Sequence, residues 1–508
     1  MSGALLVCGT HSDAGKSLIV AGLCRWLRRT GRTVAPFKAQ NMSLNSVVAR
    51  GGFEIGRAQA LQAAAAGIPA EVAMNPVLIK PSGEGHSQLI VMGKPYAELH
   101  RHGAYAVHHA ALQPIVTGAL DGLRSRFDVV ICEGAGSPAE INLRERDLAN
   151  LGLARAADLP VLLVGDIDRG GVFGALIGTV AALDADDQRH IAGYVVNKFR
   201  GDLAVLEPGL AMLQARTGRP TYGVLPFAED LDLDAEDALA LTRPRADRAA
   251  GTGGGRGTLD VACVGLRWMS NFTDLDALAR EPGVRVRMTR SPVDIARADL
   301  VVVPGTKATV EDLIRLRAEG LAGAIAARAA AGDPILGICG GYQLLGEWID
   351  DAVESGAGRV EGLGLLPVAT TFAADKVLHD SRGHSALLGA EVGGYEIRHG
   401  RPVTHGGTPL ITTDAGGPEG CVRGSVIGTS WHGLLEHDDA RRGLLRWVAG
   451  QRGLDFVPAP TTSFAAERER ALDTVADLIE QHLDTDALLA LIEGGVPANL
   501  PTLQLSLS

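Results

Sequence analysis

The sequence contains a cysteine in a setting typical of a catalytic nucleophile. Cys339 lies in Gly337-Ile338-Cys339-Gly340-Gly341, directly after a short apolar run. The pattern Gly-x-Cys-x-Gly at a strand-to-helix turn predicts a nucleophile elbow with sulfur as the attacking atom. A helix N-terminus at this point lowers a thiol pKa, and the Gly340 N–H could face a developing oxyanion. A buried structural cysteine is the alternative, and the flanking glycines favour the nucleophile.

A cysteine nucleophile needs a base, and His432 is the candidate among 14 histidines. It follows the elbow in the chain and comes soon after another apolar run, residues 425–429. Gly305 ends an earlier run and is a candidate for a second oxyanion N–H. Two residues after the histidine the residue is Leu434, and the nearest acid is Glu436. The pair therefore works either with Glu436 or as a dyad.

A second candidate site lies near the N-terminus, in GTHSDAGKS (residues 9–17). It ends in the Gly-Lys-Ser of a P-loop, with one residue more than the standard spacing, between an apolar run and a helical pattern. Glycines let backbone N–H groups turn toward phosphate, the lysine reaches the β- and γ-phosphates, and the serine ligates Mg²⁺. The candidate ATP-binding residues in this loop are Gly9, Thr10, Gly15, Lys16 and Ser17.

Polar side chains also follow other apolar runs of the first half. Glu133 is a candidate Mg²⁺ ligand, with a solvated carboxylate as the alternative. Lys38 could hold a transferring phosphoryl group, and Asn197 could read the adenine edge. Asp166 and Asp168 are candidates for substrate binding. Because ligands bind outside the carboxyl ends of strands in open α/β sheets, we expect these residues to share one crevice.

Three further residues are candidates for substrate binding. Gln40 and Asn41 follow Lys38 in the same loop. Asp147, in the segment RERDL, could bind substrate or Mg²⁺, and a helix cap or an ion pair is the alternative for it.

The elements that must position these residues form two α/β series. Short apolar runs without alternation are typical of parallel strands buried on both faces. They occur at residues 4–8, 33–37, 128–132, 160–164, 192–196, 259–264, 300–303, 334–338 and 425–429. We predict two doubly wound α/β domains, an N-terminal P-loop-type parallel sheet and a second sheet of the same kind in the C-terminal half.

The expected boundaries follow from a loss of periodicity after the first series. Residues 243–258 are polar and glycine-rich, which indicates a linker between an N-terminal domain at 1–242 and a C-terminal domain at 259–495. Residues 464–482 have helical spacing, and we expect them to pack on the second domain. Residues 496–508 are predicted to be a loose tail.

Composition limits the class of protein. The 508 residues are 46% apolar and 21% charged, with a formal net charge of −11. This balance favours a globular enzyme and disfavours a nucleic-acid partner. No signal peptide or membrane-spanning run is indicated, and the six cysteines form no CxxC pair. We therefore expect a cytoplasmic protein.

Together these motifs resemble the cobyric acid synthase family of glutamine-dependent amidotransferases. The first half is similar to dethiobiotin-synthetase-type ATPases, which implies an ATP- and corrinoid-binding synthetase domain at 1–242. The second half is similar to triad-type glutaminases, which implies a class I glutamine amidotransferase domain of flavodoxin-like fold at 259–495. Many triad-type glutaminases carry Glu two residues after the histidine, where this sequence has Leu434. The segments that resemble this family in particular are PFKAQNMSLNS (36–46), EIGRAQALQA (54–63), GDIDRGGVFG (165–174) and PGTKATVEDL (304–313).

The resemblance implies a specific reaction. ATP, as its Mg²⁺ complex, and glutamine would drive amidation of the b, d, e and g carboxylates of the corrinoid adenosylcobyrinic acid a,c-diamide, giving adenosylcobyric acid. No tightly bound prosthetic group is expected. Alternatives are a cobyrinic acid a,c-diamide synthase, another ATP-dependent carboxylate amidotransferase such as a CTP-synthase-like ligase, or a regulatory P-loop ATPase with an inactive glutaminase domain.

Overall fold

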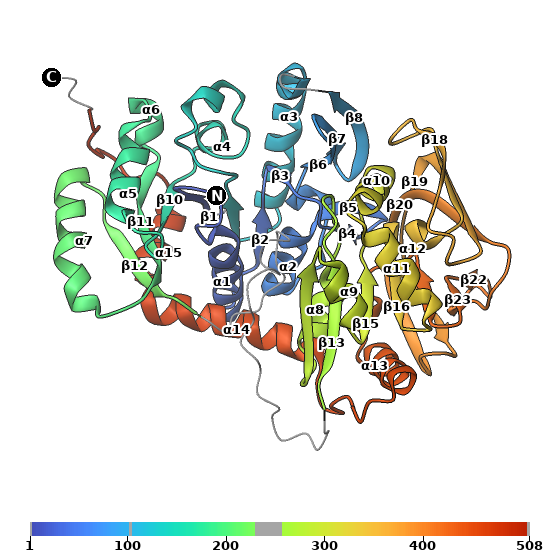
Figure 1. Ribbon diagram of the computed structural model, residues 1–508. Helices are drawn as coiled ribbons and strands as arrows, with labels where there is room; N and C mark the ends of the chain where they lie inside the picture. The colour runs from blue at the N-terminus through green and yellow to red at the C-terminus, as the bar shows by residue number, and fades with distance from the viewer. Residues whose placement is uncertain (1–2, 101–103, 229–256, 505–508) are drawn as a thin grey trace.

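The computed structural model describes residues 3–100, 104–228 and 257–504. We call residues 3–228 the N-terminal unit and residues 257–463 the C-terminal unit; the two lie side by side in Figure 1. Most of the predicted linker, residues 243–256, lies outside the described residues.

The N-terminal unit is built on a six-stranded parallel sheet in the order β12-β11-β10-β1-β9-β2. All five runs predicted in this half form strands of the sheet. The strands are β1 (Gly3–Gly9), β2 (Val34–Phe37), β9 (Val129–Glu133), β10 (Val161–Asp166), β11 (Ile191–Phe199) and β12 (Thr221–Pro226).

Helices cover both faces of this sheet, because side chains of each strand alternate between two separate apolar cores. One face carries α1 (Lys16–Arg29) and much of α2 (Arg57–Ala66). The other face carries α3 (Ala104–Arg124), α4 (Leu151–Ala157), α5 (Val172–Ala181) and α7 (Leu203–Thr217). The short helix α6 (Ala185–Gln188) precedes β11.

An insertion between β2 and β9 forms additional β-structure, which the sequence did not predict. A four-stranded sheet has the order β3-β6-β7-β8 and a separate hairpin pairs β4 with β5. The strands are β3 (Gln40–Met42), β4 (Ser46–Ala49), β5 (Phe53–Gly56), β6 (Val77–Gly83), β7 (His86–Val91) and β8 (Lys94–His100). The β4–β5 hairpin contacts the C-terminal unit.

The C-terminal unit contains a second six-stranded sheet in the order β14-β13-β15-β16-β24-β23, parallel except for β23. Its strands are β13 (Leu259–Val264), β14 (Val284–Thr289), β15 (Leu300–Val303), β16 (Ile335–Ile338), β23 (Cys421–Arg423) and β24 (Val426–Thr429). The helices are α8 (Thr273–Ala279), α9 (Pro292–Arg297), α10 (Thr309–Ala318), α11 (Leu321–Ala330), α12 (Gly340–Leu345) and α13 (Asp438–Arg452).

A further sheet in this unit has the order β18-β17-β19-β21-β22, with β20 paired to β19. These strands are β17 (Trp348–Asp351), β18 (Gly358–Glu361), β19 (Val368–Ser385), β20 (Ala390–Thr404), β21 (Ile411–Thr413) and β22 (Pro418–Glu419). The β4–β5 hairpin of the N-terminal unit packs against β19 and β20.

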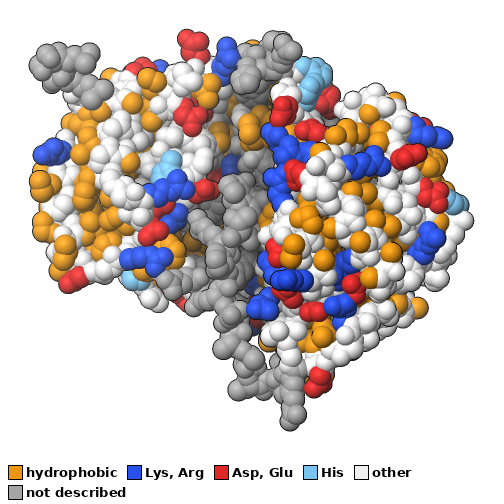
Figure 2. Space-filling model, viewed as in Figure 1, with side chains coloured by type: hydrophobic (Ala, Val, Ile, Leu, Met, Phe, Trp, Pro, Cys, Tyr) orange, Lys and Arg blue, Asp and Glu red, His pale blue; other side chains and the backbone are white. Residues whose placement is uncertain are grey.

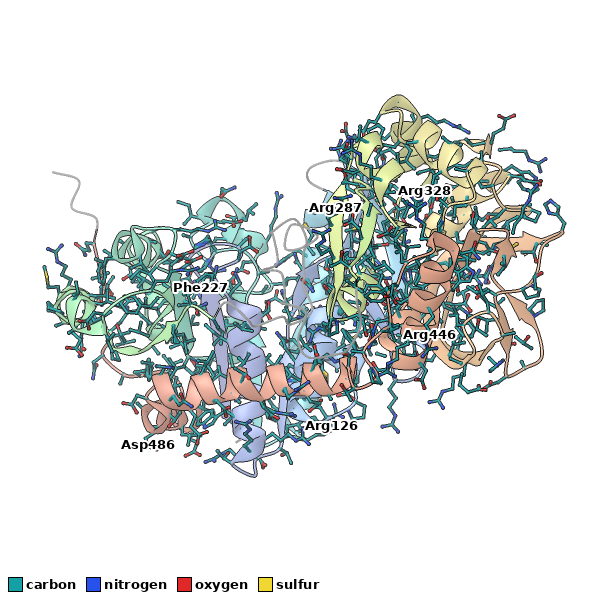
Figure 3. All side chains as sticks on the ribbon, turned by 60° about the horizontal axis from the view of Figure 1, so that its bottom comes forward. Arg126, Phe227, Arg287, Arg328, Arg446 and Asp486 are labelled. Atoms are coloured by element: carbon teal, nitrogen blue, oxygen red, sulfur yellow. The ribbon has the colours of Figure 1, made fainter. Side chains whose placement is uncertain are left out.

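The last helices correct the expectation that residues 464–482 pack on the second domain. Helix α14 (Phe464–His482) begins in the core of the C-terminal unit but then runs along α1, and α15 (Thr485–Gly494) packs against β1. Figure 1 shows α14 along the lower edge of the N-terminal unit with one end at the C-terminal unit, and Figure 3 shows the same crossing from below, with Asp486 marking α15.

Helix α14 packs on α1 because the two helices match in both apolar and charged side chains. Leu472, Ala476 and Ile479 of α14 are buried in the same core as α1. Arg25 pairs with Glu469 and Asp473, and the latter distance, Nε–Oδ1, is 2.8 Å.

The described part of the predicted tail, residues 496–504, also contacts the N-terminal unit. The N–H of Leu503 donates to Gln188 Oε1 at 2.7 Å, and Arg219 donates to the carbonyl of Pro501 at 3.0 Å. Among the described residues, no helix is long and apolar enough to cross a membrane. On the face drawn in Figure 2, basic side chains are interspersed with acidic ones over both units.

Candidate active sites

Cys339 occupies a strained turn between β16 and α12. Its backbone has φ 49° and ψ −108°, a conformation that L-residues rarely adopt. The turn is held by the Cys339 N–H, which donates to the carbonyl of Thr429 at 2.7 Å. A Cβ on Gly341 would lie 1.9 Å from the carbonyl oxygen of Val303, so the elbow requires glycine there. A Cβ on Gly340 would lie 2.8 Å from the backbone nitrogen of Thr306, on the loop that follows Gly305.

His432 is fully buried beside this loop. Its Nδ1 lies 3.1 Å from the backbone carbonyl oxygen of Asn271, and its ring stacks on Tyr395 with centroids 5.5 Å apart. A Cβ on Gly305 would lie 2.6 Å from His432 Cε1. The loop at Gly305 therefore touches both the histidine and the elbow, and it brings Cys339, His432, Gly305 and Gly340 into one neighbourhood.

Glu436 makes its hydrogen bonds away from the imidazole. Its Oε1 accepts from Arg57 Nη2 at 2.7 Å and from Thr273 Oγ1 at 3.0 Å. The partner of His432 Nδ1 is instead the carbonyl of Asn271, which the sequence did not suggest, because a backbone acceptor has no residue signature. A catalytic role for Glu436 stays a prediction.

Burial sets the electrostatics of this pair. Desolvation lowers the pKa of His432 to about 3. Desolvation raises the pKa of Cys339 to about 11, although the nearby Arg398 guanidinium opposes the shift. Near neutral pH the pair is therefore a thiol and a neutral imidazole, so proton transfer must accompany attack on a substrate.

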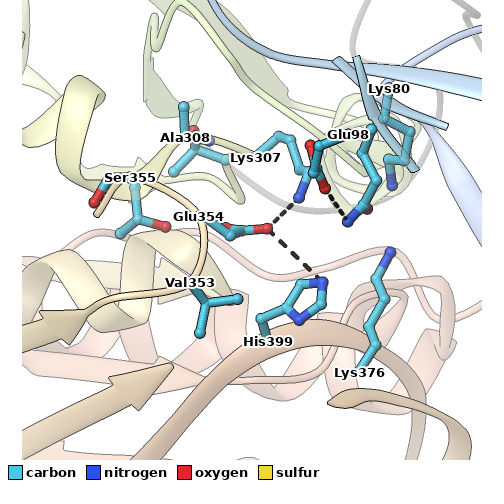
Figure 4. A network of polar contacts seen from close by, with 12 residues as sticks. Lys80, Glu98, Lys307, Ala308, Val353, Glu354, Ser355, Lys376 and His399 are labelled. Atoms are coloured by element: carbon cyan, nitrogen blue, oxygen red, sulfur yellow. Dashed lines mark hydrogen bonds and ion pairs between the residues drawn. The ribbon is translucent and has the colours of Figure 1, made fainter. Parts of the chain in front are cut away.

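A narrow pocket beside Cys339 has a charged wall, drawn in Figure 4. Lys307 pairs with Glu354, and His399 Nε2 lies 4.0 Å from Glu354 Oε1. Lys80 and Lys376 also line this pocket. Lys80 is on β6 of the N-terminal unit, so the pocket includes a side chain from each unit.

Glu54 forms ion pairs with both of these lysines. Its Oε1 lies 2.7 Å from Lys80 Nζ, and Oε2 is paired with Lys376. Burial raises the pKa of Glu54, but the two lysines outweigh it and hold that pKa well below its usual range. Burial lowers the pKa of Lys376 to about 8, against the opposing charge of Glu54. The sequence did not single out this ionic cluster.

The P-loop joins β1 to α1 as predicted. Lys16 Nζ donates to the carbonyls of His11 and Gly136 at 3.0 and 3.1 Å. Gly15 has φ 99°, and a Cβ there would lie 2.1 Å from Asn197 Nδ2. That amide donates to the carbonyl of Ala14 at 2.9 Å, so Asn197 supports the loop from β11.

Glu133 gathers three other side chains at the carboxyl end of the sheet. Its fully buried Oε1 accepts from Ser17 Oγ at 2.8 Å and from Lys38 Nζ at 2.7 Å. Its Oε2 accepts from Gln62 Nε2 at 2.5 Å. The structure thus brings together Ser17, Lys38 and Glu133, three candidates from separate strand ends, and adds Gln62. A glutamine inside a helical pattern carries no signal that would have identified it.

The three candidate aspartates of the first half, Asp166, Asp168 and Asp147, each have a different set of partners. Asp166 Oδ2 lies 2.7 Å from Lys198 Nζ, which also donates to the P-loop carbonyl of Asp13. Asp168 pairs with Arg200 at 3.1 Å. Asp147 accepts three backbone N–H bonds, from residues 149, 150 and 152, and so holds the turn that leads into α4.

A cavity of about 1300 Å³ begins at the P-loop. Its wall includes the candidate residues Gly15, Lys16, Ser17, Lys38, Gln40, Asn41, Glu133 and Asp147. Residues of β6, of β7 and of the segment 137–150 also line the cavity. Met42 and Leu143, which are 62% and 48% exposed, add apolar surface to this lining.

Comparisons with known proteins find a different family match in each half of the chain. Residues 5–240 match the CobQ/CobB/MinD/ParA nucleotide binding domain, and residues 260–440 match the CobB/CobQ-like glutamine amidotransferase domain. Fold and sites together define a glutamine amidotransferase joined to a nucleotide-binding domain, and the predicted fold class is confirmed.

The full-length relatives narrow this class. The chain is 55% identical to a cobyric acid synthase from Streptomyces avermitilis, with 99% of this chain and 98% of that protein covered. It is 56% identical to cobyric acid synthases from Frankia casuarinae (99% and 99% covered) and Streptomyces coelicolor (99% and 98% covered). The chain belongs to the cobyric acid synthase family, as the sequence motifs predicted. It is a glutamine-dependent carbon–nitrogen ligase with an amidation role in cobalamin biosynthesis, and its nucleotide-binding domain uses ATP.

Proposed function

We propose that the chain uses ATP and glutamine to amidate the b, d, e and g carboxylates of adenosylcobyrinic acid a,c-diamide. The main support is its similarity to cobyric acid synthases over nearly its whole length. The cavity next to the P-loop supports a large acceptor, because it extends well beyond the phosphate loop to Met42 and Leu143. Exposed apolar side chains there suit the hydrocarbon face of a macrocycle.

Activation of the carboxylate is the task of the N-terminal unit. A carboxylate cannot expel oxide, so its oxygen first attacks the γ-phosphorus of ATP, which forms an acyl phosphate and releases ADP. Lys16 and Lys38 would neutralise charge on the transferring phosphoryl group. Ser17 and Glu133 would ligate the Mg²⁺ of the ATP complex, because a hydroxyl and a carboxylate 2.8 Å apart are suitable oxygen donors.

Other contacts of the nucleotide and the corrinoid are assigned from position. Gly9, Thr10 and Gly15 would present the P-loop backbone to phosphate, and Asn197 would face the base. Gln40 and Asn41 line the cavity and could bind amide or carboxylate arms of the acceptor. Asp166 and Asp168 lie at the same edge of the sheet, and Asp147 lines the cavity.

Release of nitrogen is the task of the C-terminal unit. His432 takes the proton of the Cys339 thiol as sulfur attacks the glutamine amide carbon, and the N–H groups of Gly340 and Gly305 stabilise the oxyanion. The proton returns to the leaving nitrogen, so ammonia and a thioester form. Water then hydrolyses the thioester to glutamate. Ammonia displaces phosphate from the acyl phosphate and completes the amide.

The test is a mass measurement of the corrinoid product. Each amidation replaces a hydroxyl by an amino group, so the masses identify the number of amides formed from adenosylcobyrinic acid a,c-diamide with Mg²⁺-ATP and glutamine. A product with all four remaining target carboxylates amidated is expected. Turnover of cobyrinic acid, but not of its a,c-diamide, would support the diamide synthase reaction instead.

A further inference from the structure

The carbonyl of Asn271 determines which nitrogen of His432 is protonated. Because a carbonyl oxygen only accepts hydrogen bonds, the contact of 3.1 Å requires the proton on Nδ1. Nε2 then keeps its lone pair. It is buried, and within the described part of the chain it has no hydrogen-bond partner. This is the tautomer in which the imidazole can take the proton of Cys339.

Two hydrogen bonds from the N-terminal unit hold Asn271 in place. Its backbone has φ 52°, in the left-handed region that few residues other than glycine adopt. Its N–H donates to Asn45 Oδ1 at 2.8 Å, and its Oδ1 accepts from the N–H of Ser46 at 2.7 Å. Asn45, Ser46 and Asn271 are all buried. The direction of the carbonyl that orients His432 is therefore fixed by residues of the other unit.

The same segment is connected to the oxyanion loop. The N–H of Ser270 donates to the carbonyl of Gly305 at 2.9 Å, and Met269 pairs with Thr306 as an isolated β-bridge. A displacement of Asn271 would consequently affect the base and a candidate oxyanion donor together.

The holding residues lie close to the nucleotide-side cavity. Gln40, Asn41 and Met42 of β3 line that cavity, and Asn45 follows three residues later. The Asn45 N–H donates to Ser43 Oγ at 3.0 Å, so the segment between β3 and Asn45 forms a compact turn.

We propose that Asn271 is a positioning residue for His432, and that Asn45 and Ser46 of the N-terminal unit hold it in the orientation that glutamine hydrolysis requires. The proposal rests on the proposed function only in taking His432 as the base for Cys339. Without the Asn45 side chain, the backbone of Asn271 can relax from its left-handed conformation. Its carbonyl then turns away, and Nδ1 no longer holds the proton.

The experiment compares Asn45→Ala with Asn45→Asp in the full-length protein. Aspartate keeps an oxygen that can accept from the Asn271 N–H, whereas alanine does not. Glu84→Gln is the matched control, because Glu84 pairs with Arg267 at 2.9 Å across the same two units, at an exposed position. Glutamate release is measured against glutamine concentration and pH, and corrinoid amidation is measured with ammonium as the nitrogen source.

We expect Asn45→Ala to lower kcat for glutamate release by about tenfold, as for loss of a buried hydrogen bond, with little change in KM. No acid limb should appear between about pH 5.5 and 8.5, because burial keeps the pKa of His432 low and the lost contact with the Asn271 carbonyl was one that raised it. Asn45→Asp should lose less activity than Asn45→Ala, because its carboxylate can still accept from the Asn271 N–H, and Glu84→Gln should stay within about twofold of the parent protein. Ammonium-driven synthesis should be unaffected in all three variants.

The proposal is overturned if Asn45→Ala keeps the parental kcat, or if ammonium-driven synthesis falls in parallel with glutamate release. Should Asn45→Ala not fold, Asn271→Gly provides the second variant: it retains the left-handed backbone but loses the bond to Ser46. A lowered kcat with an unchanged KM in that variant supports the proposal, and an unchanged kcat overturns it. Failure of the proposed corrinoid reaction would be visible separately, as absence of amidation by the parent protein with ammonium.

Discussion

Arg57 of the N-terminal unit and Glu436 of the C-terminal unit form an ion pair, with 2.7 Å between Nη2 and Oε1. The carboxylate that lies nearest to His432 in sequence is thus bonded across the boundary between the units. Thr273 and Arg468 complete its surroundings. This arrangement favours a Cys339–His432 dyad whose histidine is oriented by a backbone carbonyl.

Glu436→Gln should therefore retain glutaminase activity within about threefold, because the amide keeps the shape of the side chain and no contact with the imidazole is lost. The measurement is kcat/KM for glutamate release, with His432→Ala as the inactive reference. A fall of about 10⁴, the size seen when a triad carboxylate is removed, would instead make Glu436 the third catalytic member.

Cys339→Ala should abolish glutamine-driven amidation but leave ammonium-driven amidation close to the parental rate, since the N-terminal unit would still form the acyl phosphate. Cys421→Ala is the matched control: its thiol is also buried in the C-terminal unit, near the carbonyl of Gly406 at 3.6 Å. That control should use both nitrogen sources. Loss of the ammonium reaction in folded Cys339→Ala would contradict the division of labour between the units.

The glutaminase reaction should show no ionisation near the ordinary histidine pKa. Burial lowers the pKa of His432 to about 3, so the imidazole is already neutral at mildly acidic pH. Burial raises the pKa of Cys339 to about 11, so the thiol stays protonated. We expect kcat/KM for glutamate release to be flat between about pH 5.5 and 8.5. A decrease on the acid side with a midpoint near the histidine reference value would indicate an imidazole in contact with solvent.

Lys16→Ala should lose amidation from both glutamine and ammonium, because phosphate activation precedes use of either nitrogen source. A loss of at least about 10²-fold is expected for removal of a cation from the transferring phosphoryl group. Lys94→Ala, at an exposed position on β8, is the control for loss of a positive charge in the same unit. Persistent turnover in Lys16→Ala would remove this lysine from the phosphate role.

The two six-stranded sheets, and the loops that carry Lys16 and Cys339, could be predicted because each is encoded by residues that are close together in the sequence. Buried parallel strands have continuous apolar runs, and the strand, glycine loop and helix around Lys16 follow one another in the chain. The same is true of the elbow at Cys339. Residues at different strand ends, such as Lys38 and Glu133, could be placed together because parallel strands end at one edge of the sheet.

Other parts of the sites depend on long-range contacts that leave no pattern in the sequence. The acceptor for His432 is a backbone carbonyl, and its position depends on Asn45, more than two hundred residues away. The buried Glu54 forms ion pairs with Lys80 of the N-terminal unit and Lys376 of the C-terminal unit. Alternating or apolar runs can predict that such strands exist, but not which charges they bring together.

The packing of helix α14 also could not be predicted, because an apolar stripe on a helix does not specify which element it packs against. Its contact with α1 can be tested by substitution. Gly22 of α1 allows close approach: a Cβ there would lie 2.7 Å from Val475 Cγ1 and 2.8 Å from Ile479 Cγ1. Gly22→Val should lower the free energy of unfolding in urea by about 1–3 kcal/mol through overpacking. Gly178→Val, in α5 with nothing within 4 Å of its Cβ position, is the control for changing helix propensity alone. Equal effects of the two substitutions would show that α14 does not press on α1 at this point.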